Sequence, residues 1–419
     1  MKQPRLLTVQ YVIVALCCAM IAPACYSLTT LPELFFPKQG ISKEQLGIVI
    51  NGADPMSRLI GRYYQQARNI PDSNVVYIHI PNSNKLSPFR FKRAKQRIEE
   101  QLPDNIQALA LAWNSPYRVG CMSATAAFSL GYDTAYCAEG CKPTKSSPYF
   151  NSTTATPLQQ FHLRPSMMLA GSDFASAKAM IDRGISSDNN QNNGEAWLMQ
   201  TSDPNRTVRQ QRFTLAEQRL GYRLPVHIEQ ADSLRNKDNV MFYFTGLTRV
   251  ADIDTNHYLP GAVGDHLTSF GGMLTDSRQM SAMQWIDAGL TGSYGTVTEP
   301  CNFLQKFPDP LTMIEHYMTG ETLVEAYWKS VLWPGQGVFI GEPLARPYSG
   351  YQISRKEGGF DVRPARLLPG LYQIKASNKQ NGPFVRSQEP ILIQPQTLRF
   401  TLLDRGYRYY QLSRYDQSH

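Results

Sequence analysis

The sequence contains none of the short motifs that usually mark cofactor chemistry. Its 419 residues include no P-loop, no glycine-rich dinucleotide fingerprint and no His-Glu-x-x-His metal motif. The sequence therefore predicts neither a bound cofactor nor a metal ion.

A strong excess of one charge is also missing. The chain has 42 Lys and Arg against 34 Asp and Glu, which gives a formal net charge of +8 at pH 7. The one short basic run is Arg90, Lys92, Arg93, Lys95 and Arg97. These residues are spaced like the solvated side of a helix and not like a nucleic-acid-binding face. We therefore expect no nucleic-acid partner.

Long apolar runs are absent after the first two dozen residues. Lys2 and Arg5 precede an apolar run at 11–21, and small residues at Ala22 and Ala24 fit a cleavage site. The run is too short for a spanning helix, so we interpret 1–24 as a signal peptide and the mature chain as periplasmic or secreted without a transmembrane segment. Lipidation of Cys25 is an alternative, but the preceding proline sits badly in a lipoprotein signal.

Cysteine is scarce, and four residues remain once the leader and Cys25 are set aside: Cys121, Cys137, Cys141 and Cys301. An even number in an oxidising compartment favours disulfides. Three pairings are possible, and we favour Cys137–Cys141 with Cys121–Cys301. A zinc site formed by Cys137, Cys141 and His162 is the alternative, although a lone Cys-x3-Cys spacing is a weak zinc signal.

Strands and helices alternate along most of the chain. Apolar strands are expected at 46–50, 75–80 and 106–113, with a helix opened by Asp54 and Pro55 between the first two. The alternation resumes after 165, with strands at 167–170, 197–199, 240–244, 290–295 and 337–340 and helices at 173–183, 208–220, 281–288, 310–318 and 322–330. This pattern predicts a mainly parallel sheet flanked by helices.

Three regions follow from the changes in pattern. We expect the signal peptide at 1–24, an α/β domain at 25–348 and a small antiparallel β domain, sandwich-like, at 349–419. Polar and small residues at 114–165 indicate an insertion in the α/β domain. The chain length allows one large core plus one smaller module.

Ligands of open parallel sheets lie beyond the carboxyl ends of the strands. That rule selects polar side chains that follow the expected strands: Asn51, Asp54, Asn114, Thr245, Arg249, Asp265, Tyr294 and Glu299. Several have structural alternatives. Asp54 fits a helix cap, Asn51 and Asn114 fit turns, and Tyr294 fits a core position.

Asp265 and His266 together with Ser269 form the most chemically suggestive constellation. A histidine supplies the near-neutral pKa of a general base, and a serine supplies a nucleophile. Structural hydrogen bonding is the alternative role for His266. Glu299 precedes Pro300 and is placed to reach the same cleft, with Arg249 as a possible ion-pair partner.

Two groups of residues resemble a family of exported bacterial proteins. One group comprises 49–51, 54–55, 63–64, 68 and 70–71, and the other comprises 260–272, 288–289, 293–297, 299–300, 320–322, 325–326 and 341–344. The second half of the chain also resembles gingipain-type cysteine peptidases. That resemblance implies a caspase-like α/β fold followed by a β-sandwich domain.

The resemblance fails at the catalytic positions. Where gingipain-type enzymes have His-Gly after a strand, this chain has Thr245-Gly246, and Ser269 stands at the best match for the nucleophilic cysteine. A thiolate nucleophile needs a base or positive field beside it. We therefore interpret the chain as a binding or accessory protein for an envelope protein or peptide. A hydrolase using Ser269 and His266, and a structural envelope module built on the β domain, are the alternatives.

Overall fold

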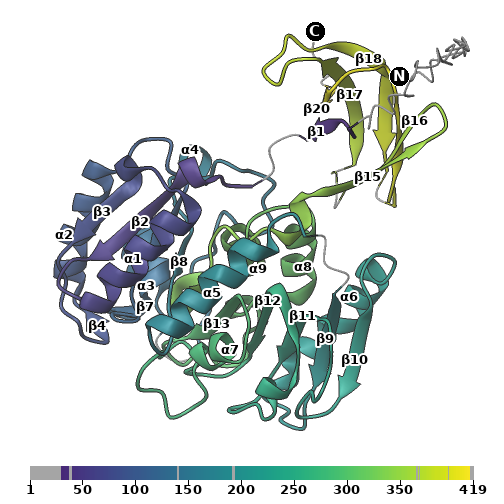
Figure 1. Cartoon of the computed structure of the whole chain (residues 1–419). Helices are drawn as coiled ribbons and strands as arrows, with labels where there is room; N and C mark the ends of the chain where they lie inside the picture. The colour runs from purple at the N-terminus through teal and green to yellow at the C-terminus, as the bar shows by residue number, and fades with distance from the viewer. Residues whose placement is uncertain are drawn as a thin grey trace, which may run out of the picture.

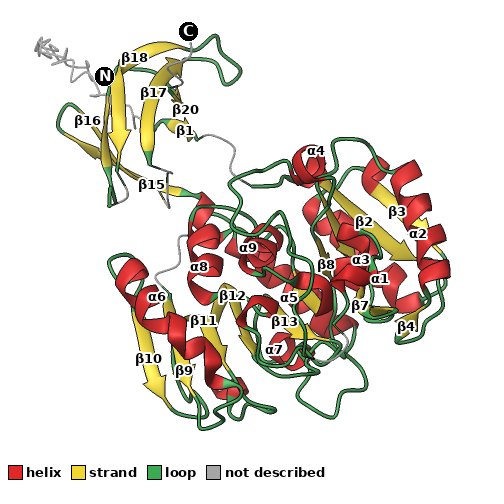
Figure 2. Ribbon diagram, turned by 180° about the vertical axis from the view of Figure 1, so that it is seen from behind, coloured by secondary structure: helices red, strands yellow, loops and turns green. Residues whose placement is uncertain are grey.

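The computed structural model describes residues 30–36, 40–138, 141–190, 194–364, 367, 369–394 and 396–415. The expected leader and Cys25 lie outside these residues. Figures 1 and 2 show an α/β body with a smaller part made of strands at one end. Within the described ranges, no helix combines the length and apolar character needed to cross a membrane.

A ten-stranded sheet runs through the α/β body in the order β10-β9-β11-β12-β13-β14-β8-β5-β2-β3. In that order its strands are β10 (Val226–Gln230), β9 (Glu195–Gln200), β11 (Val240–Thr245), β12 (Tyr258–His266), β13 (Gly292–Thr296), β14 (Gly337–Gly341), β8 (Ser166–Met168), β5 (Ala108–Leu111), β2 (Leu46–Asn51) and β3 (Val75–Ile78). Every neighbouring pair is parallel except β13 and β14. The sheet is therefore mainly parallel, as the sequence predicts. It consists of two parallel halves, and the strands at their junction, β13 and β14, run antiparallel.

The antiparallel junction has a simple cause. Two parallel strands are usually connected by one helix, which returns the chain to the end of the sheet where the first strand began. Two helices, α8 (Pro310–Met318) and α9 (Leu323–Ser330), lie between β13 and β14 and pack against each other. The chain consequently enters β14 from the opposite end.

The remaining helices are α1 (Pro55–Arg68), α2 (Pro88–Gln101), α3 (Ala124–Leu130), α4 (Pro157–Phe161), α5 (Phe174–Ser187), α6 (Phe213–Leu220) and α7 (Met283–Asp287). α1 packs on β2 and beside α5, and Phe91 of α2 contacts Phe128 of α3 with ring centroids 5.1 Å apart. Helices thus flank the sheet (Figure 2). All six residues of β2 are buried, as expected for a strand covered on both faces.

The start of α1 shows how local sequence determines structure. Asp54 accepts a hydrogen bond from the backbone N–H of Met56 at 2.9 Å, and Pro55 occupies the first helical position. Asn69 ends the helix in the left-handed conformation with φ of 51°. A Cβ at Gly61 would lie 2.5 Å from Ile50, so this glycine allows α1 to approach the sheet closely.

The expected insertion contains short strands and α3. Its strands β6 (Arg118–Val119) and β7 (Met122–Ser123) form a separate small sheet with β4 (Lys85–Leu86), which precedes the insertion in sequence. α3 is buried against β8 and β14. The insertion therefore contributes to the core of the α/β body, and residues 114–165 are not a surface loop alone.

The smaller part is made of strands from both ends of the described chain. β15 (Tyr351–Lys356), β16 (Gly359–Pro364) and β19 (Phe400–Leu403) form one antiparallel sheet. A second, mixed sheet contains β17 (Gly370–Ser377), β18 (Val385–Ile393), β20 (Tyr409–Arg414) and β1 (Glu33–Phe35). β1 pairs parallel with β20. The part has a hydrophobic core of its own, which includes Leu34, Val362 and Leu412. No strand was expected at 33–35, so the place of β1 in this sheet was not predicted.

Candidate functional site

A polar pocket of about 310 Å³ lies beyond the carboxyl ends of β12 and β13. Its wall is completed by the loop that follows β9. The lining residues are Asn205, Arg206, Leu267, Thr268, Ser269, Glu299, Cys301 and Asn302. The position agrees with the rule for parallel sheets, since β9 and β11 are neighbours at a point where strand order reverses. We call this the β12–β13 pocket.

Arg206 is held in the pocket wall by two partners. Its Nη1 lies 2.7 Å from Oδ2 of Asp203, and its Nε donates to the Thr268 hydroxyl at 3.4 Å. The Thr268 hydroxyl in turn donates to Oε1 of Gln279 at 2.8 Å. These contacts fix a guanidinium group at the pocket while leaving it partly exposed to solvent.

Ser269 and Glu299 are the two candidate residues that the structure brings to this pocket. The Ser269 hydroxyl forms no hydrogen bond within the described part of the chain, whereas its carbonyl accepts from Thr296 at 2.9 Å. The Glu299 side chain is exposed and accepts from the backbone N–H of Cys301 at 2.8 Å. Both side chains are therefore available to a ligand.

His266 lies behind the pocket with both ring nitrogens occupied. Trp285 Nε1 donates to Nδ1 at 2.9 Å, and Nε2 lies 3.1 Å from the Met280 carbonyl. Because indole N–H is only a donor, Nδ1 must accept and Nε2 must carry the proton. The imidazole is thus neutral, with no lone pair left for Ser269. The pair that the sequence suggested as base and nucleophile is not assembled in this structure.

The electrostatics agree with this assignment. Burial lowers the pKa of His266 to about 3, and the positive charges of Arg209, Arg206 and Arg249 act in the same direction. Hydrogen bonding to the Met280 carbonyl opposes the shift but does not overcome it. A histidine with so low a pKa is a poor proton acceptor at neutral pH.

The pH dependence of stability tests this description of His266. The pKa falls from 6.5 to about 3 on folding, so below pH 6.5 the unfolded chain binds a proton that the folded chain does not. The His266 contribution to the free energy of unfolding therefore decreases as the pH falls from 6.5 toward 3. When the pH is lowered from 7 to 4.5, we expect the free energy of unfolding to fall by about 2–3 kcal/mol more for wild type than for His266→Gln. Urea denaturation at the two pH values measures this difference.

Asp265 changes the pH dependence of stability in the opposite direction to His266. The His266→Gln variant keeps Asp265 and therefore serves as the reference. Burial raises the pKa of Asp265 from 3.8 to about 6, so its contribution to stability grows as the pH falls through that range. This contribution is common to both proteins and cancels in the difference. Parallel pH profiles would show that His266 is protonated in the folded chain and would contradict the neutral assignment.

A buried charged cluster lies beneath the pocket. Arg209 Nη1 is 2.6 Å from Oδ1 of Asp265, with side chains 3% and 0% exposed. Arg209 also donates to the Thr245 carbonyl and lies over the Phe244 ring. The hydroxyl groups of Thr245 and Ser293 are buried without hydrogen bonds to described residues. Asp265 therefore pairs with Arg209 and does not orient His266.

Three of the other candidate residues have structural roles. Asn51 donates to the Ile80 carbonyl at 3.0 Å, and Asn114 donates to the Gly171 carbonyl at 2.7 Å, so each joins the ends of two segments. The buried Tyr294 hydroxyl donates to the Lys306 carbonyl. Arg249 is exposed, and among the described residues no ion pair joins it to Glu299, which accepts from the Cys301 backbone instead, so the expected couple is not formed.

Several residues at the site were not among the predicted site residues. Arg206 lies in the loop after β9, and Arg209 lies in the segment expected as a helix at 208–220, where the structure has a 3-10 helix at Thr207–Arg212 before α6. Lys306 is 0% exposed, and its Nζ has no hydrogen bond to a described residue. Burial lowers the pKa of Lys306 to about 8, with the charge of Glu299 opposing the shift. No sequence motif surrounds these residues, so only the strand-end rule could have indicated them.

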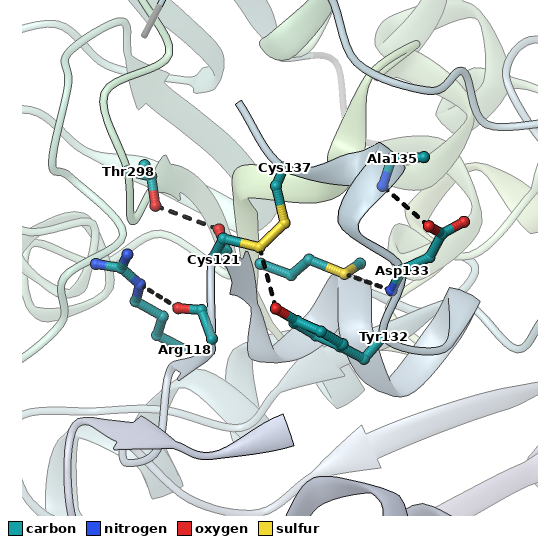
Figure 3. The surroundings of a disulfide bond; sticks show 9 residues. Arg118, Cys121, Tyr132, Asp133, Ala135, Cys137 and Thr298 are labelled. Carbon is teal, nitrogen blue, oxygen red and sulfur yellow. Dashed lines mark hydrogen bonds between the residues drawn. A yellow bond between two sulfur atoms is a disulfide. The ribbon is translucent and has the colours of Figure 1, made fainter. Parts of the chain in front are cut away.

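The disulfides pair differently from the expectation. Cys121 bonds to Cys137 and Cys141 bonds to Cys301, so the favoured Cys137–Cys141 and Cys121–Cys301 pairs are wrong. Around the first bond, Thr298 donates to the Cys121 carbonyl at 3.3 Å (Figure 3). The second bond joins the insertion to the pocket wall at Cys301. The Cys141–Cys301 bond and the Thr298 hydrogen bond thus hold the loop that carries Glu299 against the insertion.

These pairs also remove the zinc alternative, because Cys137 and Cys141 belong to different disulfides. Among the described residues, no three His, Cys, Asp or Glu side chains are placed to hold a metal ion. His162 caps the end of α4 with φ of 54°.

Comparisons with known proteins give one structural likeness. No family model matches the chain, and no curated protein matches it in sequence. The fold is similar to that of the Arg-specific cysteine proteinase gingipain R, at 9% identity and a TM-score of 0.39. The match covers 90% of this chain and 99% of that chain. At this TM-score, no catalytic residue is transferred from one chain to the other.

Proposed function

We propose that this chain is an exported cell-envelope protein whose gingipain-like α/β domain has no Cys-His catalytic pair and serves as a binding or accessory protein. One observation carries the proposal: the thiols and the imidazole that Cys-His catalysis needs are occupied. All four cysteines of the described residues are in disulfides, and both nitrogens of His266 are hydrogen-bonded. Peptidase chemistry of this class requires a thiolate and a base.

The β12–β13 pocket offers recognition groups in place of catalytic ones. Arg206 provides donors, Glu299 provides acceptors, and Ser269 and Asn302 can do both. A peptide presents amide N–H and C=O groups that match this mixture. We therefore propose a peptide, or an exposed segment of an envelope protein, as the ligand of the pocket.

The proposal includes the organisation and location of the chain. We propose 1–24 as the leader, 25–348 as the α/β domain in a caspase-like arrangement and 349–419 as the β domain. The two disulfides support an oxidising compartment, the periplasm or the outside of the cell.

The alternative hydrolase would require His266 to give up its hydrogen bond from Trp285.

The proposal predicts peptide binding without peptide cleavage. Mature protein is used to select binders from a random peptide library, and the dissociation constants of the selected peptides are measured. Ser269→Trp fills the pocket and should weaken binding by at least about tenfold. Ser354→Trp, on the exposed side of β15, is the matched control and should bind like wild type.

Activity is measured on the same preparations with fluorogenic peptide substrates. We expect no hydrolysis and no effect of iodoacetamide. Cleavage that thiol alkylation blocks would overturn the assignment as a non-peptidase. Selected peptides that bind Ser269→Trp as tightly as wild type would remove the pocket as the binding site.

A further inference from the structure

A second hollow, of about 450 Å³, lies in the other half of the α/β body. It is lined by Ile78, His79, Ile80 and Pro81 after β3 and by Arg90, Arg93, Ala94 and Arg97 of α2. β3 is the outermost strand of the ten-stranded sheet, and α2 packs on it (Figure 1). The hollow is therefore at the carboxyl end of a parallel strand, where ligands of such sheets bind. We call it the α2 hollow.

Three arginines face this hollow from one side of α2. Arg90, Arg93 and Arg97 are three and four residues apart, so they are neighbours along the helix surface. Ala94 lies among them and is buried. Its short side chain leaves room between longer arginine side chains. This spacing places three guanidinium groups around a single concavity.

The charge of these arginines is not compensated nearby. Within the described ranges, none of the three forms an ion pair or a hydrogen bond with an acidic side chain. The acids of α2 have other partners: Glu99 pairs with Lys95 and Arg164, and Glu100 accepts from Gln96 at 2.8 Å. His79 adds a further donor on the strand side of the hollow. The concavity thus has a surplus of positive charge.

We propose that the α2 hollow binds a ligand bearing phosphate groups. A guanidinium group donates two parallel hydrogen bonds to phosphate oxygens, and three such groups match a multiply charged oxyanion better than a single carboxylate. The hollow is larger than one phosphate ion, so it has room for a ligand with a second phosphate or an attached organic group. This site is separate from the β12–β13 pocket and does not depend on the function proposed for it.

Two probes separate the possible sources of the phosphate. Pyrophosphate represents a soluble phosphorylated compound and is titrated by calorimetry at low salt. Vesicles of phosphatidylcholine with and without phosphatidylglycerol represent a lipid headgroup and are tested by cosedimentation. The test variant is Arg90→Gln/Arg93→Gln/Arg97→Gln, in which every substituted residue is exposed, so folding should be preserved.

A charge-matched control is available. Lys92→Gln/Arg278→Gln/Lys379→Gln removes the same charge from exposed residues outside the hollow. We expect the test variant to bind the preferred probe at least about tenfold more weakly and the control to stay within about twofold of wild type. A selective loss of pyrophosphate binding supports a soluble ligand, and a selective loss of vesicle binding supports a headgroup. Equal losses in both variants, or no binding of either probe to wild type, would overturn the site.

Discussion

Replacing Arg209 with methionine is expected to lower the free energy of unfolding by about 3–5 kcal/mol at pH 8. Methionine keeps most of the buried volume but leaves Asp265 with no positive partner at 2.6 Å. Asp265 is completely buried, and its pKa is already raised to about 6 with Arg209 present. Without that arginine, a charged carboxylate in this position loses the interaction that offsets its desolvation.

The same variant should be less damaged at acidic pH. Below about pH 5 the carboxyl group of Asp265 is neutral in Arg209→Met, so the unpaired charge disappears. The double variant Arg209→Met/Asp265→Leu should recover most of the stability at every pH, because replacing both members of a buried pair is often close to neutral. Denaturant unfolding of the three proteins at pH 5 and pH 8 measures the effect. A double variant no more stable than Arg209→Met would show that the cost comes from packing.

Removal of the Cys141–Cys301 disulfide is expected to destabilise the chain by up to about 5 kcal/mol. The bond spans a sequence separation of 160, so its removal gives the unfolded chain a large gain in conformational entropy, which favours the unfolded state. The Cys121–Cys137 bond spans a separation of 16 and should contribute about 3 kcal/mol. The two effects should therefore differ by about 2 kcal/mol.

The variants Cys141→Ser/Cys301→Ser and Cys121→Ser/Cys137→Ser serve as controls for each other, since each keeps one bond intact. Both are compared with wild type by urea denaturation without reductant. The loops do not overlap in sequence, so the two losses should be nearly additive when both bonds are removed. The opposite order of stability would mean that loop entropy in the unfolded chain does not determine the contribution of these bonds.

Local signals predicted local structure well. Asp54 and Pro55 indicated the first residue of α1, and Pro310 and the residues after it indicated α8 with the observed bounds. Each of these signals acts within one turn of a helix, where the sequence neighbours are also the spatial neighbours. The mainly parallel sheet followed from the alternation of such elements.

Features that depend on distant partners were not predictable in the same way. The disulfide pairs are determined by which loops meet in space, and the sequence left three pairings open. His266 is occupied by Met280 and Trp285, which follow β12 in a loop and a short helix with no motif of their own. Arg209 meets Asp265 across the end of β11, and neither residue lies near the other in sequence. The strand-end rule found the region of the site but not its contacts.

The pairing of β1 with β20 has a mechanical consequence. Glu33 aligns with Tyr409, so the α/β body is inserted between two neighbouring strands of one small sheet. The strands are parallel, so tension applied before β1 and after β20 would pull them in opposite directions along their shared ladder. The backbone hydrogen bonds between β1 and β20 would resist this tension in shear, and the chain between the two strands would be stretched only after they break. As long as β1 and β20 stay paired, tension applied to the chain before β1 and after β20 is therefore not transmitted to the α/β body.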